Sequence, residues 1–220
     1  MEVLKTTDLK KIYQTPSGEV RALDGINISI EEGEFIAIIG SSGSGKTTLL
    51  NMLGGLDDPT SGDIIVRGRN LTTLTSEELT VFRRRNIGFV FQNYNLLPIL
   101  NVSENITLPL KLDGMGQDLN FFDQITDSLK LRDKLYSMPN TLSGGQQQRV
   151  AIARALSMKP AVILADEPTG NLDSKTGIEV VGLLKASAAR FSQTIVVVTH
   201  NEEIAQMADR MIRIEDGKVR

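Results

Sequence analysis

The chain has 220 residues, of which 40% are apolar, 24 are basic and 27 are acidic, so one α/β domain with a real core fits its length. A formal net charge of −3 argues against a dedicated nucleic-acid binder, while the lack of cysteine excludes a disulfide framework or a cysteine metal site and is compatible with the cytosol. No apolar run approaches the roughly 18 residues of a membrane span, and no signal-peptide pattern opens the chain.

Residues up to about 34 predict antiparallel β structure. The segment Val3–Tyr13 alternates loosely between apolar and polar side chains, and Asn27–Ile30 also alternates. Between them, Thr15–Gly18 has the composition of a turn. Tyr13, taken alone, is typical of an exposed residue on an edge strand.

The next segment has the order strand, glycine-rich turn, helix. Phe35–Ile39 is an apolar, β-branched run typical of a buried parallel strand, and Lys46–Leu53 is predicted to be a helix. The turn completes the phosphate-binding pattern G-x-x-x-x-G-K-[ST], and the predicted nucleotide contacts are Gly40, Ser41, Ser42, Gly43, Ser44, Gly45, Lys46, Thr47 and Thr48. Lys46 should reach the β- and γ-phosphates, and the Thr47 hydroxyl should bind Mg²⁺. A glycine-rich turn without a ligand is the alternative, and the flanking strand and helix argue against it.

Two shorter strands are predicted before residue 92. The turn Asp58–Gly62 leads to Asp63–Val66, and Ile87–Phe91 follows the basic run Arg83–Arg85. We interpret that run as a solvated helix end rather than a nucleic-acid or lipid patch. Gln92 ends the second strand, where an amide can touch Mg²⁺ and an attacking water without changing charge.

Residues 99–158 have helical periodicity, which is broken by Pro109 and by a polar loop over 113–118. Within them, Leu142–Gln146 opens the helical stretch Gln147–Leu156, with Ser143 as N-cap. The two glycines leave the helix end uncovered, so that a phosphate could approach its N–H groups. This motif has no obvious partner in its own chain, which suggests that two chains meet at the site. An ordinary capped helix is the alternative.

Polar side chains follow two further apolar runs. Ala161–Ala165 precedes Asp166 and Glu167, and Ile195–Val198 precedes Thr199 and then His200, the only histidine in the chain. Ligands collect at the C-terminal ends of strands in open α/β sheets. We therefore predict that Asp166 holds Mg²⁺, that Glu167 polarises the attacking water, and that His200 bonds the γ-phosphate. A surface acidic pair and a structural histidine are the alternatives.

The C-terminal part is predicted to add a helix and a hairpin. Residues 174–190 have a helical pattern, and residues 211–219 predict a terminal hairpin around Asp216-Gly217. Together with the three apolar strands, these elements predict an α/β fold whose sheet is covered on both faces.

Taken together, these motifs resemble those of the ATP-binding cassette (ABC) ATPases, and the resemblance covers essentially the whole chain in the family's order. The matches are Gly40–Thr47 (Walker A), Gln92 (Q-loop), Leu142–Gln146 (signature), Val162–Asp166 (Walker B) with Glu167 after it, Asn171–Asp173 (D-loop) and His200 (switch histidine). The resemblance implies a P-loop NTPase with a mainly parallel core sheet, an antiparallel β subdomain and a small α-helical lobe. Residues 1–220 would form one ABC ATPase domain, with a RecA-like core at about 1–92 and 159–220 and a helical subdomain at about 93–158.

The resemblance also implies how such a site works with ATP and Mg²⁺. Two chains should form an ATP-dependent, head-to-tail homodimer, in which ATP lies between Walker A of one chain and Ser143, Gly145 and Gln146 of the other. Tyr13 falls where the family stacks an aromatic ring on adenine, and Asp173 is expected among the nucleotide contacts. The expected catalytic residues are Lys46, Gln92, Glu167 and His200, and the expected Mg²⁺ ligands are Thr47, Gln92 and Asp166.

A finer resemblance links the chain to the macrolide-exporter, lipoprotein-release, cell-division and bacitracin-exporter group. It rests on Asp166–Asp173, Gly88–Gln92, Asn95–Leu97 and Asn51–Leu56, while Asn201 departs from the usual Asp. It implies an ATPase that powers export of a peptide, drug or lipoprotein through a partner permease docked near Gln92–Leu100. The chain should then be cytoplasmic and peripheral on the inner face of the membrane, with no nucleic-acid partner.

Three other functions stand beside this one. Soluble ABC ATPases of DNA repair or translation usually have coiled coils, zinc cysteines or two cassettes in one chain, which this sequence lacks. A P-loop kinase would not need the signature and the D-loop. A regulatory nucleotide-binding scaffold fits the group as well, although the intact Glu167 and His200 favour hydrolysis.

Overall fold

Two sheets form the scaffold of the computed structural model, which describes residues 1–16 and 18–220; Ser17, in the predicted turn Thr15–Gly18, lies outside the described residues. The first sheet is antiparallel and has the order β2 (Gly18–Glu31), β1 (Glu2–Thr15), β4 (Ser61–Val66), β5 (Arg69–Asn70). The second has the order β10 (Lys218–Val219), β9 (Arg210–Glu215), β3 (Phe35–Ile39), β8 (Thr194–Val198), β7 (Val162–Asp166), β6 (Ile87–Phe91). All pairs in the second sheet are parallel except β9 with β10.

The parallel sheet is covered on both faces, and this explains its apolar strands. Side chains alternate along β3, so Ile36 and Ile38 face one side and Phe35 and Ala37 the other. The first side packs on α1 (Lys46–Leu53) and the antiparallel sheet. The second side packs on α5 (Gly144–Ser157) and α6 (Ser174–Phe191). The structure confirms the predicted α/β fold with a mainly parallel core sheet and antiparallel β structure beside it.

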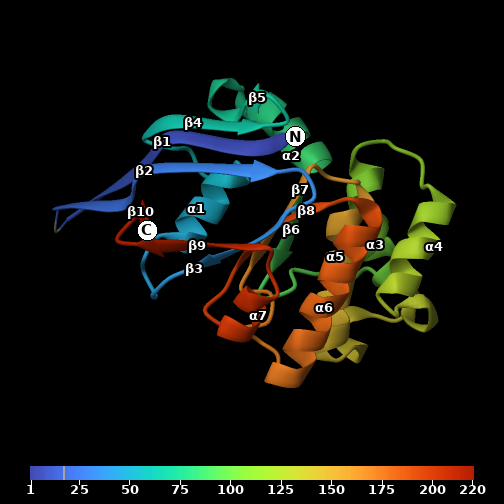
Figure 1. Cartoon of the computed structure of the whole chain (residues 1–220). Coiled ribbons are helices and arrows are strands. Elements are labelled where there is room, and N and C mark those ends of the chain that lie inside the picture. The colour runs from blue at the N-terminus through green and yellow to red at the C-terminus, as the bar shows by residue number, and fades with distance from the viewer. Residues whose placement is uncertain (17) are drawn as a thin grey trace.

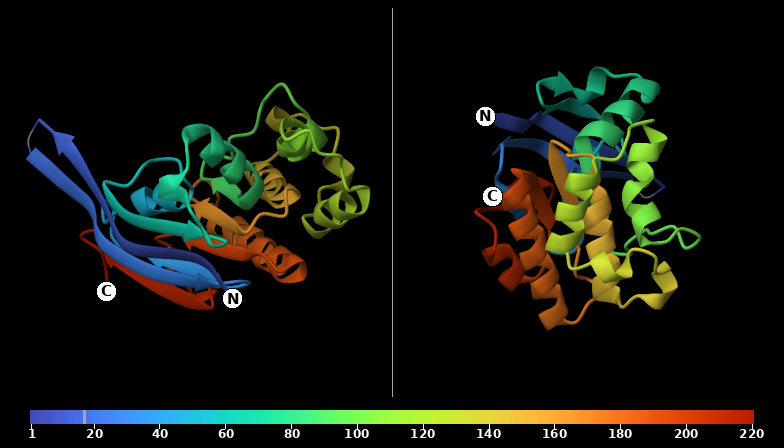
Figure 2. Two further views of the ribbon diagram at one scale, coloured as in Figure 1. Left: turned by 90° about the horizontal axis from the view of Figure 1, so that it is seen from above. Right: turned by 90° about the vertical axis from the view of Figure 1, so that its right-hand side faces the viewer.

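The remaining helices are α2 (Ser76–Asn86), α3 (Val102–Leu112), α4 (Leu119–Ser128) and α7 (Glu202–Gln206), together with three short 3₁₀ turns, η1 (Leu71–Thr73), η2 (Arg132–Lys134) and η3 (Pro139–Thr141). Capping boxes fix where two of the helices begin: Thr75 with Glu78 starts α2, and Asn101 with Glu104 starts α3. Figures 1 and 2 show α3 and α4 at one end of the molecule, with β1 and β2 reaching out at the other. None of the helices in the described ranges combines the length and apolarity needed to cross a bilayer.

Two details differ from the sequence predictions. The predicted break at Pro109 is wrong, because α3 continues through it to Leu112. A proline removes only one helical hydrogen bond, and the carbonyl of Pro109 still accepts from the Asp113 N–H at 3.1 Å. Strand β4 begins at Ser61 rather than Asp63, because Ser61 still pairs with Lys10 of β1.

The basic run Arg83–Arg85 does end helix α2, as predicted, but it is not simply solvated. Arg84 and Arg85 form ion pairs of 3.2 and 2.9 Å with Asp113, whose side chain is only 3% exposed. Arg83 donates to the Gly55 carbonyl at 2.7 Å. The run therefore ties α2 to the end of α3.

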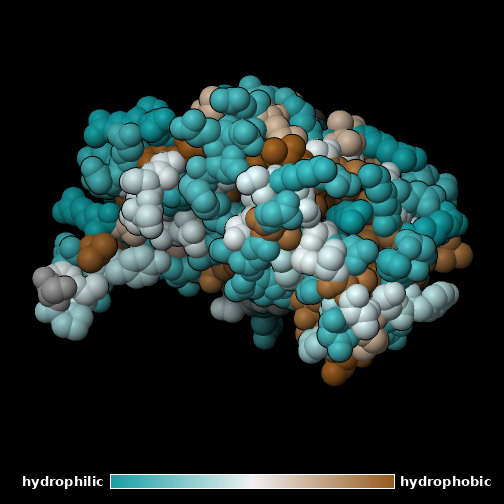
Figure 3. Space-filling model, turned by 90° about the horizontal axis from the view of Figure 1, so that it is seen from below, coloured by the Kyte–Doolittle hydropathy of each residue, from teal (hydrophilic) through white to brown (hydrophobic). Residues whose placement is uncertain are grey.

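The surface seen from below is mostly hydrophilic, with apolar residues in small, separate spots (Figure 3). This pattern follows from the two hydrophobic clusters, which take up the apolar faces of both sheets.

Candidate functional site

The functional side chains predicted from the sequence follow strands that end at one edge of the parallel sheet. Strands β3, β6, β7 and β8 run in the same direction, so their C-terminal ends meet there. A cavity of about 560 Å³ opens at this edge. Its lining includes Ser42, Gly43, Gly45, Lys46, Thr47, Thr48, Glu167 and His200.

The phosphate loop needs glycine at two close approaches. Gly40 and Gly45 have φ of 155° and 105°. A Cβ at Gly40 would lie 2.2 Å from the Ile214 carbonyl oxygen, and one at Gly45 would lie 2.3 Å from that of Ala22. Gly45 is also the N-cap of α1, which has no side-chain cap. The first N–H groups of α1 are therefore left for an external anion.

Two buried polar groups in this loop also suit an anion. Lys46 is only 8% exposed, and its ammonium donates to the carbonyls of Gly40 at 2.9 Å and Ser41 at 2.7 Å. The Ser44 hydroxyl is buried and has no hydrogen-bond partner among the residues that the structure describes. A buried hydroxyl without a partner is costly, and a phosphate oxygen could satisfy it. These groups fit a nucleotide's phosphates.

Thr47 and Asp166 meet beside the loop. The Thr47 hydroxyl donates to Asp166 Oδ1 at 3.2 Å. Burial raises the pKa of Asp166; the Thr47 bond acts against this shift and the charge of Glu167 adds to it. A cation next to Asp166 would offset this burial. One carboxylate and one hydroxyl, completed by waters and phosphates, form the kind of donor set that Mg²⁺ takes.

Glu167 and His200 form a second pair. Glu167 Oε1 lies 2.9 Å from His200 Nδ1, and the two side chains are 20% and 74% exposed. The backbone of Glu167 is left-handed, with φ of 44°, and its N–H donates to the Val198 carbonyl at 3.0 Å. Such a conformation in a non-glycine residue is strained and clusters at functional sites. Here it turns the carboxylate toward His200.

Gln92 lies at the same sheet edge but is turned elsewhere. Its amide donates to Asn171 Oδ1 at 3.3 Å, and Asn171 Nδ2 donates back to the Gln92 carbonyl at 3.0 Å. Within the described chain, Gln92 is not among the residues that line the phosphate cavity. The sequence motif did not predict that Asn171 would hold this amide.

Tyr13 lies on β1, and its hydroxyl donates to Asp57 at 2.9 Å. Burial raises the pKa of Tyr13, and the bond to Asp57 acts in the same direction. Lys11 lies 5.0 Å from the ring centroid. Tyr13 is 39% exposed as a residue but does not appear in the described lining of the phosphate cavity.

The signature residues lie outside the phosphate cavity of their own chain. The Ser143 hydroxyl accepts from the Gln146 N–H at 3.3 Å, and the Gln146 side chain accepts from the Ser143 N–H at 2.9 Å. Gly145 packs on α6, where a Cβ would lie 2.6 Å from Thr176 Cγ2. Asp173 caps α6 by accepting from the Thr176 N–H at 3.0 Å, and its hydrogen bonds with Thr176 lower the pKa of Asp173. In the described structure, none of these four predicted contacts lines the cavity.

Five residues that line one side of the cavity were not predicted from the sequence. Val20, Arg21 and Ala22 of β2 line it, as do Asp216 and Gly217. The pair Asp216-Gly217 was visible as a turn signal, but its place beside the phosphate loop depends on β9 pairing with β3. The Gly217 N–H donates to the Ser44 carbonyl at 3.0 Å and supports the loop.

Comparison with known sequences gives a consistent result. The sequence profile of the ABC transporter family matches residues 23–170. The chain is 46% identical over 215 residues to the macrolide export ATP-binding/permease protein MacB of Rhodopirellula baltica, which covers 96% of this chain but 31% of that protein. It is also 46% identical over 220 residues to an uncharacterized ABC transporter ATP-binding protein of Thermotoga maritima, covering 99% of this chain and 94% of that protein.

Comparison with solved structures points to the same family. Two dimeric structures of the cassette MJ0796 are 43% and 44% identical, with TM-scores of 0.86 and 0.87 over 98% of this chain and 96% of theirs. One of them is a post-hydrolysis state bound to ADP and Pi. With a family match over most of the chain and relatives of this similarity, the chain belongs to the ABC transporter family and is an ATP-binding cassette with the P-loop NTPase fold and ATPase activity.

Proposed function

We propose that this cassette powers an export or mechanotransmission complex and hydrolyses ATP in a head-to-tail dimer. The observation that carries this proposal is the separation of the two motifs: the phosphate loop, Glu167 and His200 line one cavity, and Ser143, Gly145 and Gln146 lie outside it. The related cassette MJ0796 is dimeric. In an isologous pair, α5 of each chain would cover the cavity of the other and complete two equivalent sites.

The roles of the residues follow from their placement. Lys46 and the N–H groups at the start of α1 bind the β- and γ-phosphates. Ser41, Ser42 and Ser44 belong to the same loop, and Ser42 lines the cavity. Thr47 and Asp166 would hold Mg²⁺, which supplies neutralising charge for the phosphates. Gln92 would become a further Mg²⁺ ligand once the hydrogen bond between its amide and Asn171 is broken.

The hydrolytic step needs a proton acceptor and a group that orients the γ-phosphate. Glu167 accepts the proton of the attacking water. His200, held 2.9 Å from Glu167, bonds the γ-phosphate. Tyr13 stacks on the adenine, Thr48 adds a contact beside Thr47, and Asp173 at the start of α6 contributes from the second chain.

A complementation experiment tests the head-to-tail site. Lys46→Ala removes the ammonium that should bind the phosphates, and Ser143→Arg places a large side chain at an exposed position of the signature. Mixing the two variants gives one intact site per heterodimer only if the loop and the signature come from different chains. We expect the mixture to hydrolyse ATP faster than either variant alone. A mixture no faster than its parts contradicts the composite site.

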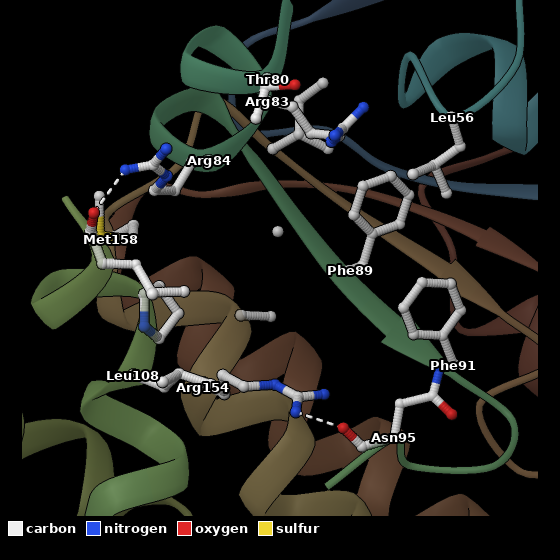
Figure 4. A pocket seen from close by; sticks show the side chains of 15 residues that line it. Leu56, Thr80, Arg83, Arg84, Phe89, Phe91, Asn95, Leu108, Arg154 and Met158 are labelled. Atoms are coloured by element: carbon white, nitrogen blue, oxygen red, sulfur yellow. Dashed lines mark hydrogen bonds between the residues drawn. The ribbon is translucent and has the colours of Figure 1, made fainter. Parts of the chain in front are cut away.

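The proposed permease surface is a groove of about 450 Å³ (Figure 4). Helix α2 and strand β6 form one side of it, and helices α3 and α5 form the other. Its lining includes Leu56, Phe89, Phe91, Leu108, Arg154 and Met158. The rings of Phe89 and Phe91 stack with centroids 5.4 Å apart. Of the predicted docking segment Gln92–Leu100, Asn95 contributes to this lining. An apolar helix of a permease would fit it.

Leu56 offers the cleanest test, because it lines the groove and is 44% exposed. In a complex purified with its permease, we expect Leu56→Asp to abolish stimulation of the ATPase by the permease and to leave the basal ATPase intact. The matched control is Leu119→Asp, because Leu119 is 69% exposed on α4 and outside the groove. Equal stimulation in both variants contradicts docking there.

The permease would also place the cassette in the cell. Docked through this groove, the chain would be peripheral on the cytoplasmic face of the membrane, and the cargo would be a drug, peptide or lipoprotein. We propose that about 93–158, which contains α3, α4 and α5, moves as the helical subdomain against a core of about 1–92 and 159–220.

A further inference from the structure

The loop that follows Gln92 has an unusual backbone. Tyr94 and Asn95 are consecutive residues with φ of 60° and 49°. Few non-glycine residues adopt this left-handed conformation, and two in succession need surroundings that hold them there.

Arg154 of α5 provides that hold. Its Nη1 donates to the Asn95 carbonyl at 2.5 Å and its Nη2 to the Tyr94 carbonyl at 2.9 Å (Figure 4 shows the bond to Asn95). The planar guanidinium presents two N–H donors in a fixed fork, which matches two neighbouring carbonyls.

An ion pair with a carboxylate does not account for the position of the Arg154 guanidinium. In the described ranges, no carboxylate forms an ion pair with Arg154. Burial alone lowers the pKa of its guanidinium. Burying a cation costs free energy unless it is hydrogen-bonded, and the Tyr94 and Asn95 carbonyls supply these bonds.

Two further contacts join the same loop to α5. Gln148 Nε2 lies 3.4 Å from the Phe91 carbonyl, just before Gln92. At the other end of the loop, the Tyr94 hydroxyl packs on Gly144, where a Cβ would lie 2.7 Å from it. Gln92 therefore sits on a backbone held on both sides by the helix that carries the signature.

We infer that Arg154 is a positioning residue, which fixes the Tyr94–Asn95 turn and thereby sets where the Gln92 amide can reach. Arg154 also lines the docking groove, so an occupant of the groove would touch the group that holds the loop. The inference rests on the proposed role of Gln92 and deepens it. Through the side chain of Arg154, the docking groove and the signature helix would both be linked to the Gln92 amide.

The test compares Arg154→Met with Arg190→Met, a matched change at an exposed arginine of α6 that bonds Ser128. Amide hydrogen exchange, equilibrium binding of a fluorescent ATP analogue and kcat are measured for both. For Arg154→Met we expect exchange over 92–97 to accelerate by about tenfold or more with the rest of the chain unchanged. We expect ATP affinity within about twofold of wild type and kcat lower by about tenfold, because the phosphate loop is intact and only Gln92 is misplaced. Arg190→Met should match wild type in all three.

Arg154→Lys keeps the positive charge and serves as the second variant if Arg154→Met folds poorly. It lacks the planar fork, and we expect intermediate exchange over 92–97 and an intermediate kcat. Wild-type exchange and kcat in both variants, or a loss of protection spread evenly over the chain, would overturn the inference. Gln92→Ala separates the two proposals: wild-type turnover in that variant removes the role of Gln92, whereas the exchange data still decide whether Arg154 holds the loop.

Discussion

Helices α1 and α5 both point an N-terminus at a predicted phosphate site, yet they begin in opposite ways. Helix α1 starts at a glycine, with no side-chain cap. Helix α5 starts at Ser143, in a capping box that Gln146 completes. The first end leaves its N–H groups to an external anion, whereas at the second end the Ser143 hydroxyl accepts from the Gln146 N–H.

This contrast suggests an order of events. The phosphate loop contains a buried hydroxyl, that of Ser44, and a buried ammonium, that of Lys46, before any anion binds. At the signature end the capping box forms without an anion, and the Ser143 O–H and the Gln146 NH2 group can still donate to a phosphate. Nucleotide should therefore bind first to α1 of one chain, and α5 of the second chain should close over it.

The largest effect should come from Glu167→Gln, which separates chemistry from binding at α1. The amide cannot take the proton of the attacking water, so we expect turnover to fall by about 10²–10⁴ while ATP still binds. Steady-state ATPase rates together with sizing in ATP check this, and ATP-bound dimers should accumulate. Glu203→Gln, at an exposed position of α7, is the control. Undiminished turnover removes Glu167 from its role as base.

The next largest effect concerns ATP affinity, which should depend on the N-terminus of α1 and not on that of α5 in the same chain. Lys46→Met removes a charged donor to phosphate, and we expect ATP affinity to fall by about ten- to a hundredfold. Ser143→Ala should leave the affinity of the dilute, monomeric chain unchanged, because α5 is not part of that chain's own cavity. Equilibrium binding of a fluorescent ATP analogue measures both, with Lys130→Met as a surface control. Equal losses in Lys46→Met and Ser143→Ala would mean that one chain binds ATP through both ends.

A smaller effect concerns stability without nucleotide. Ser143→Ala removes the cap of α5 and should lower the free energy of unfolding by about 1 kcal/mol, whereas Ser143→Gly should cost only a few tenths. Urea unfolding of the nucleotide-free chain measures the difference. If Ser143→Ala is as stable as wild type, the capping box does not stabilise α5 and the contrast with α1 disappears.

The smallest effect should come from Asp166→Asn. Because burial raises the pKa of Asp166, the folded chain binds this proton more tightly than the unfolded chain, and its ionised form costs stability as pH rises through the raised pKa. The substitution should therefore raise Tm at pH 7 in the absence of Mg²⁺ and nucleotide. The gain should shrink as pH falls toward the ordinary value of 3.8. Thermal unfolding between pH 5 and 8, the range in which the chain is expected to stay folded, tests the trend. A gain that grows toward low pH contradicts it.

Much of the fold was predictable because it depends on short-range patterns. Phe35–Ile39, Lys46–Leu53 and Ile87–Phe91 have the predicted bounds, since apolar β-branched runs and a glycine-rich turn define them locally. The sheet-edge placement of Asp166, Glu167 and His200 also followed, because parallel strands end at one edge. The continuation of α3 through Pro109 did not follow, because a proline costs the helix one hydrogen bond without ending it, and the Pro109 carbonyl still accepts from Asp113.

The sequence by itself determined the chemistry of this protein: which side chains can hold phosphate, bind a cation or accept a proton, and after which strands they stand. Only the tertiary structure decided their partners. It turned Gln92 toward Asn171, placed Asp216-Gly217 against the phosphate loop and set Arg154 on the carbonyls of Tyr94 and Asn95. The physical reason is range: a strand or a cap is fixed by neighbours in the chain, whereas a hydrogen bond between residues about 60 positions apart exists only after sheet order and helix packing have brought them together.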